Sequence, residues 1–238
     1  MGSTRFPGKV MMEIAGKPML HHLLDRLEKC RNLDEIVVAT SVKVQDDVIF
    51  CFCEKRNVPC FRGSEEDVLG RMLGSFQNRK ADLGVVVYGD NPLIDPYVVD
   101  EHIVLFKESD EYDWIGNDLK TTFPSGMDVE VFSVTALEDA AARTTDPAIR
   151  EHGTLYIRKN PQTYRLLNVE AQGVRRRPDL YLGIDTDKDA QVVKSIVQHF
   201  EHDQSYTLEK IIAFLDCHPE LAQSNRNIIR RWRKYRDD

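Results

Sequence analysis

The sequence predicts an α/β protein with a doubly wound, mostly parallel sheet and helices at its C-terminal end. Apolar runs of strand length at residues 35–40 and 84–88 show no polar alternation, which is typical of parallel strands covered on both faces. Apolar residues at three- and four-residue spacing predict helices in segments 18–30, 44–55 and 68–79. Strands that alternate with helices in this way form right-handed βαβ units.

The pattern changes after about residue 110. We expect the region 113–170 to form an irregular insertion that covers the substrate or pairs with a second subunit. Beyond residue 187 the chain has the pattern of helices, and Pro219 opens one of them because proline favours the first helical turn. The elements predicted within the insertion are strands at 113–116, 128–133 and 163–168 and helices near 135–143 and 150–159.

Length and composition favour one domain. A chain of 238 residues with 42% hydrophobic residues can bury a large core, and no Gly/Ser-rich linker separates two parts of it. We therefore predict a single domain over 1–238, with a core over about 1–190 and a helical C-terminal appendage over about 190–238.

Charge and hydropathy exclude several functional classes. The net charge of −7 argues against nucleic acid as a partner, and the locally basic segment 230–236 is predicted to be the solvated end of an amphipathic helix. No apolar run approaches the roughly 18 residues of a membrane helix, and no export signal is visible, so we expect a cytoplasmic location without a membrane partner. The five cysteines lack paired CxxC spacing and are expected to be reduced thiols.

The segment Gly2-Ser3-Thr4-Arg5-Phe6-Pro7-Gly8-Lys9 has the composition of a loop that binds polyphosphate. Glycines let backbone N–H groups approach phosphate oxygens, and the two cations neutralise charge that grows during phosphoryl chemistry. The GxxxxGK[ST] order of a P-loop is absent. On composition alone, a solvated basic turn is the competing interpretation.

Two acidic turns follow short apolar segments. Asp90 lies directly after the most apolar predicted strand, at the strand end where open α/β sheets bind ligands. Asp185 lies in a similar turn, and two such carboxylates that converge on one ion would form a magnesium site. Asp95 is expected to cap the next helix whatever Asp90 does, and the alternative interpretation of both turns is that they only cap helices, with Asp187 as the second N-cap.

A third polar segment surrounds Asp128 and Glu130. If both residues lie in one strand, alternation puts their side chains on the same face, where they bind sugar hydroxyls or a base, or simply face solvent. Farther along the chain, Arg150-Glu151-His152 forms a dense polar group at a predicted helix start.

Taken together, these stretches resemble the cytidylyltransferase family typified by the spore coat polysaccharide biosynthesis protein of the F type, which is related to acylneuraminate and ketodeoxyoctonate cytidylyltransferases. The matching pieces occur in order across nearly the whole chain, which makes the resemblance far more specific than any one motif. They are residues 2–10, 16–20, 34–41, 61–69, 89–96, 123–133 and 150–152.

The resemblance implies a Rossmann-like nucleotidyltransferase fold and a Mg²⁺-dependent transfer of CMP from CTP to a sugar, commonly a nonulosonic acid, by an enzyme that is expected to be a homodimer. It assigns catalytic roles to Arg5, Lys9 and Asp90. Magnesium would be held by Asp90 and Asp185. The nucleotide would be bound by Gly2, Ser3, Thr4, Arg5, Lys9, Arg62, Gly63 and Ser64, and the acceptor by Asp128, Glu130 and Arg150.

The chain departs from the family pattern in two places. The family has an apolar strand ending in arginine before the Gly-Ser-Thr-Arg segment, and we expect that strand to be encoded upstream of Met1, since its loss would expose neighbouring strand edges. Val86 and Tyr88 replace an arginine and a threonine usual in the family. Two alternatives therefore stay open: a catalytically impaired nucleotide- or sugar-binding relative, and a nucleotidyltransferase that uses another base.

Overall fold

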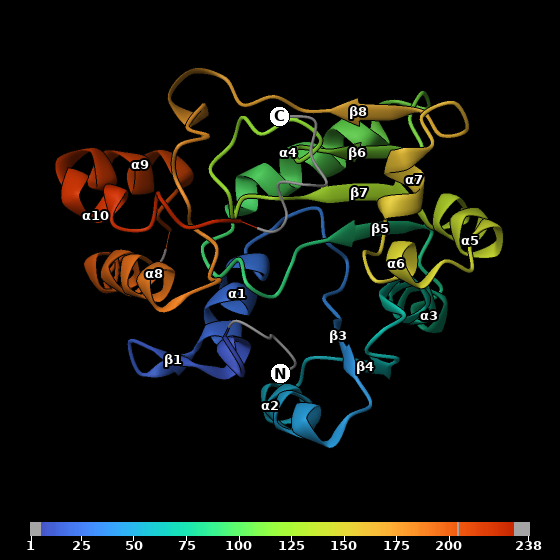
Figure 1. Cartoon of the computed structure of the whole chain (residues 1–238), viewed down its shortest axis with the longest axis horizontal. Coiled ribbons are helices and arrows are strands. Elements are labelled where there is room, and N and C mark those ends of the chain that lie inside the picture. The colour runs from blue at the N-terminus through green and yellow to red at the C-terminus, as the bar shows by residue number, and fades with distance from the viewer. Residues whose placement is uncertain (1–5, 204, 231–238) are drawn as a thin grey trace.

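The strands of the computed structural model, which describes residues 6–203 and 205–230, fall into three sheets. The largest sheet has the strand order β5–β7–β6–β8, and its strands are stacked from bottom to top in Figure 1. Their bounds are Leu83–Val86 (β5), Trp114–Gly116 (β6), Glu130–Ser133 (β7) and Leu166–Asn168 (β8).

This sheet is mixed instead of mostly parallel. β6 and β8 are parallel, but β7 runs antiparallel to both of its neighbours, with Val131 opposite Val85 on one side and Ile115 on the other. The reason lies in the connection between β6 and β7, residues 117–129, which contains no helix. A parallel pairing of these strands would need a crossover connection, which is usually helical. The predicted α/β class is confirmed, but the predicted mostly parallel strand direction is wrong for this sheet.

The other two sheets are small. β3 (Val38–Ser41) and β4 (Cys60–Gly63) form a parallel pair joined through helix α2 (Asp47–Arg56). β1 (Glu13–Ile14) and β2 (Lys17–Pro18) form a hairpin whose two-residue turn has positive φ angles at both positions, as a type I′ turn requires. No described strand joins the β3–β4 pair to the four-stranded sheet.

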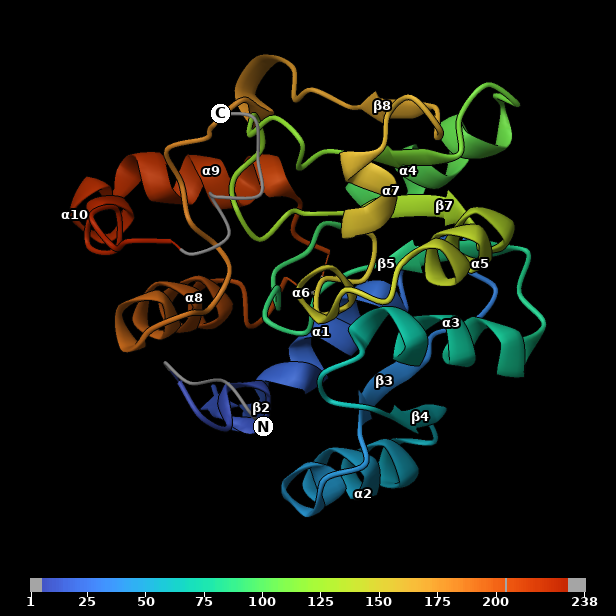
Figure 2. The ribbon, with the colours of Figure 1, turned by 45° about the vertical axis from the view of Figure 1, so that its right-hand side comes forward.

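Helices cover the sheets as separate layers. α4 packs against β6 and β7, while α3 packs against α5 and β4, and the latter group comes forward in Figure 2. The helical bounds are Met19–Leu27 (α1), Val68–Arg79 (α3), Pro96–Lys107 (α4), Val134–Arg143 (α5), Pro147–Arg150 (α6), Leu155–Lys159 (α7), Asp187–His199 (α8), Leu208–Cys217 (α9) and Pro219–Gln223 (α10). The 3₁₀ helices are Lys9–Met11 (η1), Val44–Asp46 (η2) and Gly173–Arg175 (η3).

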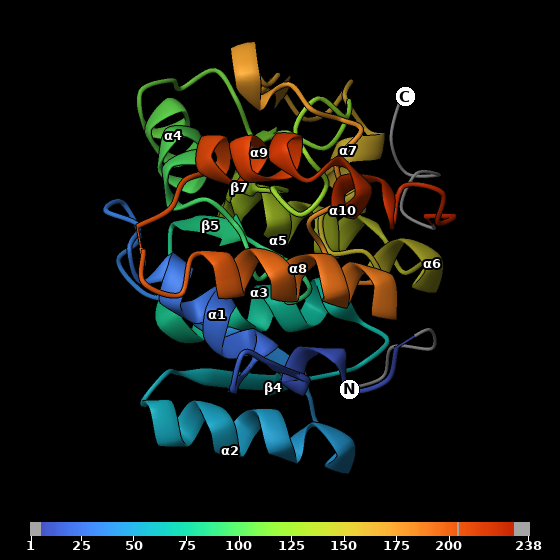
Figure 3. The ribbon, with the colours of Figure 1, turned by 90° about the vertical axis from the view of Figure 1, so that its left-hand side faces the viewer.

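The C-terminal helices share the main hydrophobic core. Buried residues of that core run from Ile14 to Leu215 and include Val193 and Ile196 of α8 and Ile211 of α9. Figure 3 looks onto this end of the molecule, where α8 and α9 lie in front of the sheets. None of the helices in the described part of the chain has the length and apolarity that crossing a bilayer requires.

Three local expectations need correction. The region 113–170 supplies β6, β7 and β8, so it is part of the large sheet and not an insertion upon it. Arg150 is the last residue of α6, because the helix already begins at Pro147 with Asp146 as its N-cap. The N-cap of α8 is Thr186, not Asp187, because the Thr186 hydroxyl and the Asp189 carboxylate form a reciprocal capping box.

Candidate active site

A tight turn at the N-terminal end of the described chain carries Lys9. Gly8 has a φ of 76°, a left-handed conformation that glycine adopts without strain, and it precedes η1. Backbone bonds from Lys9 N to Phe6 O (3.3 Å) and from Met11 N to Gly8 O (2.9 Å) close the turn. The predicted phosphate-loop residues Gly2, Ser3, Thr4 and Arg5 lie outside the described residues.

The two acidic turns predicted from the sequence are direct neighbours. Ile184 N donates to Asp90 O at 2.9 Å, which ties the turn after β5 to the turn before α8. Residues 125–126 lie against the same segment, because Leu182 N donates to the carbonyl oxygen of Ser125 at 2.7 Å. A Cβ on Gly126, whose φ is 99°, would come within 2.5 Å of Gly183 N, so the close approach of these backbones requires glycine.

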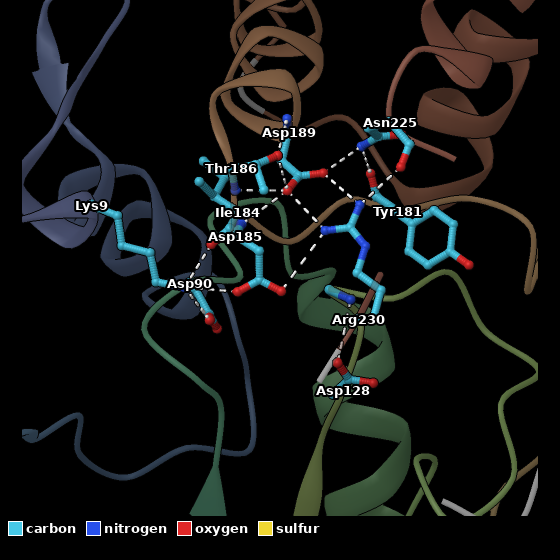
Figure 4. A network of polar contacts seen from close by, with 11 residues as sticks. Lys9, Asp90, Asp128, Tyr181, Ile184, Asp185, Thr186, Asp189, Asn225 and Arg230 are labelled. Carbon is cyan, nitrogen blue, oxygen red and sulfur yellow. Dashed lines mark hydrogen bonds and ion pairs between the residues drawn. The ribbon is translucent and has the colours of Figure 1, made fainter. Parts of the chain in front are cut away.

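Lys9 lies between these acidic turns (Figure 4). Its Nζ is 2.7 Å from Asp90 Oδ2, 2.7 Å from the carbonyl oxygen of Ile184 and 3.3 Å from Asp185 Oδ1. The Lys9 and Asp185 side chains are 12% and 15% exposed, while that of Asp90 is 33% exposed, so the group is reachable from one side. The structure thus brings together three predicted residues that are far apart in the sequence.

A second cation lies behind this group. Arg230 forms a bidentate ion pair with Asp189, with Nη1–Oδ2 and Nη2–Oδ1 distances of 2.8 and 2.7 Å, and its guanidinium lies 3.8 Å from Asp185 Oδ2. Asn225 also donates to Asp189, at 2.8 Å. Burial alone would raise the pKa of Asp189, but the bonds and charge of Arg230 outweigh burial and lower it. The predicted solvated helix end is wrong for Arg230, which is 5% exposed.

The sequence reasoning missed the roles of Asp189, Asn225 and Arg230. The Thr186-x-x-Asp189 spacing is a readable capping-box signal. Nothing in the sequence links Arg230 to that turn, because the pairing spans 41 residues and depends on how the chain returns after α10.

A cavity of about 780 Å³ opens beside the Lys9 group. It is lined by Val10 and Gly89, the chain neighbours of Lys9 and Asp90, and by Thr40 and Ser41 of β3. The size lies within the range of about 300–1,000 Å³ that is usual for small-molecule sites. The other lining residues are Leu20, Val38, Ala39, Asp46, Ile49, Glu65, Glu66, Arg71, Pro147, Ala148 and Glu151.

Arg62, Gly63 and Ser64, predicted to lie near the nucleotide, are found at the end of β4, next to residues that line this cavity. Arg62 donates to the carbonyl oxygens of Ser41 and Lys43 at 3.0 Å each. Ser64 Oγ accepts from Asp67 N at 3.1 Å. These contacts fix the rim of the cavity, and nucleotide contact by the three residues stays a prediction.

Asp128 and Glu130 do not share a strand face. Asp128 precedes β7 and accepts from Gly126 N at 3.3 Å, which keeps it beside the acidic turns. Glu130 is fully buried and accepts from Tyr88 Oη at 2.7 Å, from Trp114 Nε1 at 2.9 Å and from Thr154 Oγ1. Alternation failed as a guide because the regular strand begins only at Glu130.

Glu130, Trp114 and Thr154 are buried, whereas Tyr88 is 39% exposed overall and reaches Glu130 with its hydroxyl. Burial, reinforced by the Glu130 charge, raises the pKa of Tyr88 well above its usual value. The third residue predicted to bind substrate, Arg150, pairs with Asp67 at 2.9 Å and donates to the carbonyl oxygens of Ala141 and Thr144. Its contacts therefore tie α6 to the segment before α3, and a role in acceptor binding stays a prediction for Glu130 and Arg150.

We expect Glu130→Ala to lower the free energy of unfolding by about 2–4 kcal/mol, because it leaves two buried donors, Trp114 and Thr154, and the half-buried Tyr88 hydroxyl without their acceptor. Glu130→Gln keeps one acceptor oxygen and should cost less. Urea unfolding measures both, with the surface variant Glu138→Ala as the control. An unchanged stability combined with a raised KM for the acceptor would instead show that Glu130 contacts the sugar.

Comparisons with known proteins identify the family of this chain. The sequence profile of the cytidylyltransferase family matches residues 1–229. Spore coat polysaccharide biosynthesis protein SpsF of Bacillus subtilis is 33% identical over 228 residues, which covers 93% of each chain. The 3-deoxy-manno-octulosonate cytidylyltransferase of Geobacter metallireducens is 37% identical over 101 residues, 42% of this chain and 39% of that one.

A solved structure extends the agreement to the fold. A cytidylyltransferase from Leptospira borgpetersenii superposes with a TM-score of 0.90 at 29% identity, covering 97% of this chain and 95% of that one. The predicted nucleotidyltransferase fold is thereby confirmed. By its sequence profile and by its relatives, this chain belongs to the cytidylyltransferase family of nucleotidyltransferase enzymes.

Proposed function

We propose that this enzyme transfers CMP from CTP to a sugar acid, specifically a nonulosonic acid, in a Mg²⁺-dependent reaction of surface polysaccharide biosynthesis. The observation that carries the proposal is the convergence of the Lys9 ammonium, the Asp90 and Asp185 carboxylates and the Ile184 carbonyl beside the cavity. The names of the relatives supply the substrate class, since one acts on an octulosonate and another serves a spore coat polysaccharide.

The oxygen atoms around Lys9 suit a magnesium ion. Two carboxylates and one carbonyl oxygen point at a single cationic centre, and hard oxygen ligands of this kind are what Mg²⁺ prefers. Nitrogen and sulfur ligands of softer metals are absent from this group of contacts. The bound ion would supply charge neutralisation at the triphosphate and a link between nucleotide and protein.

The chain's own residues would position the substrates and balance charge. With the carboxylates engaged by a metal, the Lys9 ammonium would be free to turn toward the triphosphate, and its chain neighbour Val10 lines the cavity. Thr40 and Ser41 line the cavity wall, where their hydroxyls donate to Asp46 at 2.8 and 2.6 Å and so hold this wall in place for the nucleoside. Asp128, which accepts from Gly126 N beside the same turns, would accept hydrogen bonds from the acceptor hydroxyls.

The proposed reaction is a direct in-line displacement. The sugar hydroxyl oxygen forms a bond to the α-phosphorus of CTP, the bond from that phosphorus to the bridging oxygen breaks, pyrophosphate leaves, and the hydroxyl proton passes to solvent. Catalysis by position and charge is sufficient for this chemistry, which needs no covalent intermediate with the protein.

The direct test is pyrophosphate release by the full-length protein with CTP, Mg²⁺ and a panel of nonulosonic and octulosonic acids. We expect turnover with at least one acid and a larger thermal stabilisation by CTP than by UTP, GTP or ATP, since the preferred nucleotide stabilises the fold by mass action. Stabilisation by CTP without turnover would favour the impaired relative, and equal or greater stabilisation by another nucleotide would contradict cytidine specificity.

A further inference from the structure

The segment after α10 closes over the turn that carries Asp185. Asn225 Nδ2 donates to the carbonyl oxygen of Tyr181 at 3.1 Å, and the Arg230 guanidinium lies 4.6 Å from the centre of the Tyr181 ring. Arg230 Nη2 also donates to Asn225 O at 3.0 Å, and this bond stabilises the conformation of the segment itself. The side chains of Asn225 and Arg230 therefore hold this segment against Tyr181, through its carbonyl oxygen and its ring.

Asp189 links Arg230 to the backbone of Asp185 through hydrogen bonds. Its Oδ2 accepts from the backbone nitrogens of Asp185 and Thr186 at 3.0 and 2.9 Å, and the same oxygen accepts from Arg230 Nη1 at 2.8 Å. Figure 4 shows the chain of contacts from Arg230 through Asp189 to Asp185. The peptide that carries Asp185 is thus held by a carboxylate that is itself held by Arg230.

Arg230 also acts on the Asp185 side chain. The two Asp185 oxygens lie between two cations, with Oδ1 3.3 Å from Lys9 Nζ and Oδ2 3.8 Å from Arg230 Nη1. This arrangement favours the orientation of the carboxylate in which one oxygen faces Lys9 and the other faces Arg230. The Arg230 and Asp189 side chains are 2% and 0% exposed, so water screens little of their interaction.

We propose that Arg230 is a positioning residue for the metal-binding turn, so that the C-terminal segment sets the affinity of Asp90 and Asp185 for a divalent cation. The proposal rests on the proposed function, in which these two carboxylates hold magnesium. Buried ion pairs contribute little net stability compared with apolar side chains of similar size. The Arg230–Asp189 pair contacts the predicted metal ligand Asp185, so positioning of that ligand explains the pair better than stability does. Residues that orient metal ligands from behind change metal affinity by about 10- to 100-fold when they are removed.

The test compares Arg230→Met with Arg26→Met in the full-length protein. Arg26 is a matched control because it is 3% exposed, donates at 2.7 Å to the carbonyl oxygens of Ile94 and Tyr206, and stacks 4.2 Å over the Tyr206 ring, contacts that involve neither Asp185 nor Asp189. Mn²⁺ binding is followed by electron paramagnetic resonance, with Mn²⁺ as the oxygen-preferring probe ion. Hydrogen exchange is measured on a peptide that contains the Asp185 and Thr186 amides.

We expect Arg230→Met to weaken Mn²⁺ binding about tenfold or more and to speed exchange of the two amides, relative to Arg26→Met. Arg230→Lys keeps the charge but not the bidentate geometry, so it should fall between wild type and Arg230→Met and provides the comparison if the methionine variant does not fold. Equal Mn²⁺ affinity and equal exchange in the Arg230 and Arg26 variants would overturn the proposal.

Failure of the proposed function gives a different pattern. A wild-type protein that binds no Mn²⁺ and releases no pyrophosphate contradicts the metal site itself. The exchange rates then still decide whether Arg230 holds the Asp185 turn, because they need neither metal nor substrate.

Discussion

Asp90→Asn is expected to lower kcat/KM by about a thousandfold, with little loss of stability. Asparagine has nearly the same shape as aspartate, but it removes one of the two carboxylates that converge on Lys9. Loss of a single group that stabilises transition-state charge typically costs about 100- to 1,000-fold, and loss of a metal ligand lies at the upper end. Pyrophosphate release at saturating Mg²⁺ measures the effect, and Asp185→Asn should behave in the same way.

The control for this prediction is Asp216→Asn. Asp216 pairs with Arg177 at 2.6 Å and is 56% exposed, so its replacement removes the same charge from a site unconnected with Lys9. It should leave kcat/KM within about twofold of wild type, since exposed ion pairs contribute little. Activity of Asp90→Asn close to that of the Asp216 variant would show that Asp90 holds neither metal nor substrate.

Local sequence patterns predicted the elements that position this site. Apolar runs and helical periodicity located β5 and α3 because both effects act within one element, and α3 was placed at its observed bounds, Val68–Arg79. Asp95 was correctly expected to cap α4, where its side chain accepts from Tyr97 N at 2.9 Å. The convergence of Asp90 with Asp185 was also predicted, from two turns of similar form.

Strand direction and the buried polar networks could not be predicted in this way. The antiparallel course of β7 depends on a connection without a helix, a feature that apolar patterns in the strands do not encode. Glu130 was expected to bind the acceptor or to face solvent, yet its partners come from three other segments, at Tyr88, Trp114 and Thr154. Arg230 likewise finds its partner only when the chain has folded back.

Lys9→Met is expected to make the folded protein more dependent on Mg²⁺ while it lowers turnover by about 100-fold or more. Without the ammonium, the Asp90 and Asp185 carboxylates and the Ile184 carbonyl lose the cation that now lies between them. Unbalanced charges in a mostly buried site destabilise the fold, here by about 1–3 kcal/mol because Asp90 is partly exposed. A divalent cation replaces the lost charge, so Mg²⁺ should raise the Tm of the variant more than that of wild type.

Thermal unfolding in EDTA and in Mg²⁺ measures this difference, with Lys17→Met as the matched control. Lys17 is 49% exposed and lies 3.6 Å from Asp25, so its loss should not change the Mg²⁺-dependent shift in Tm. If Mg²⁺ stabilises Lys9→Met and wild type equally, the ammonium and the metal do not use the same oxygens. A larger shift in the variant would mean that wild-type Lys9 leaves the carboxylates when the metal binds, which is the movement that brings its charge to the triphosphate.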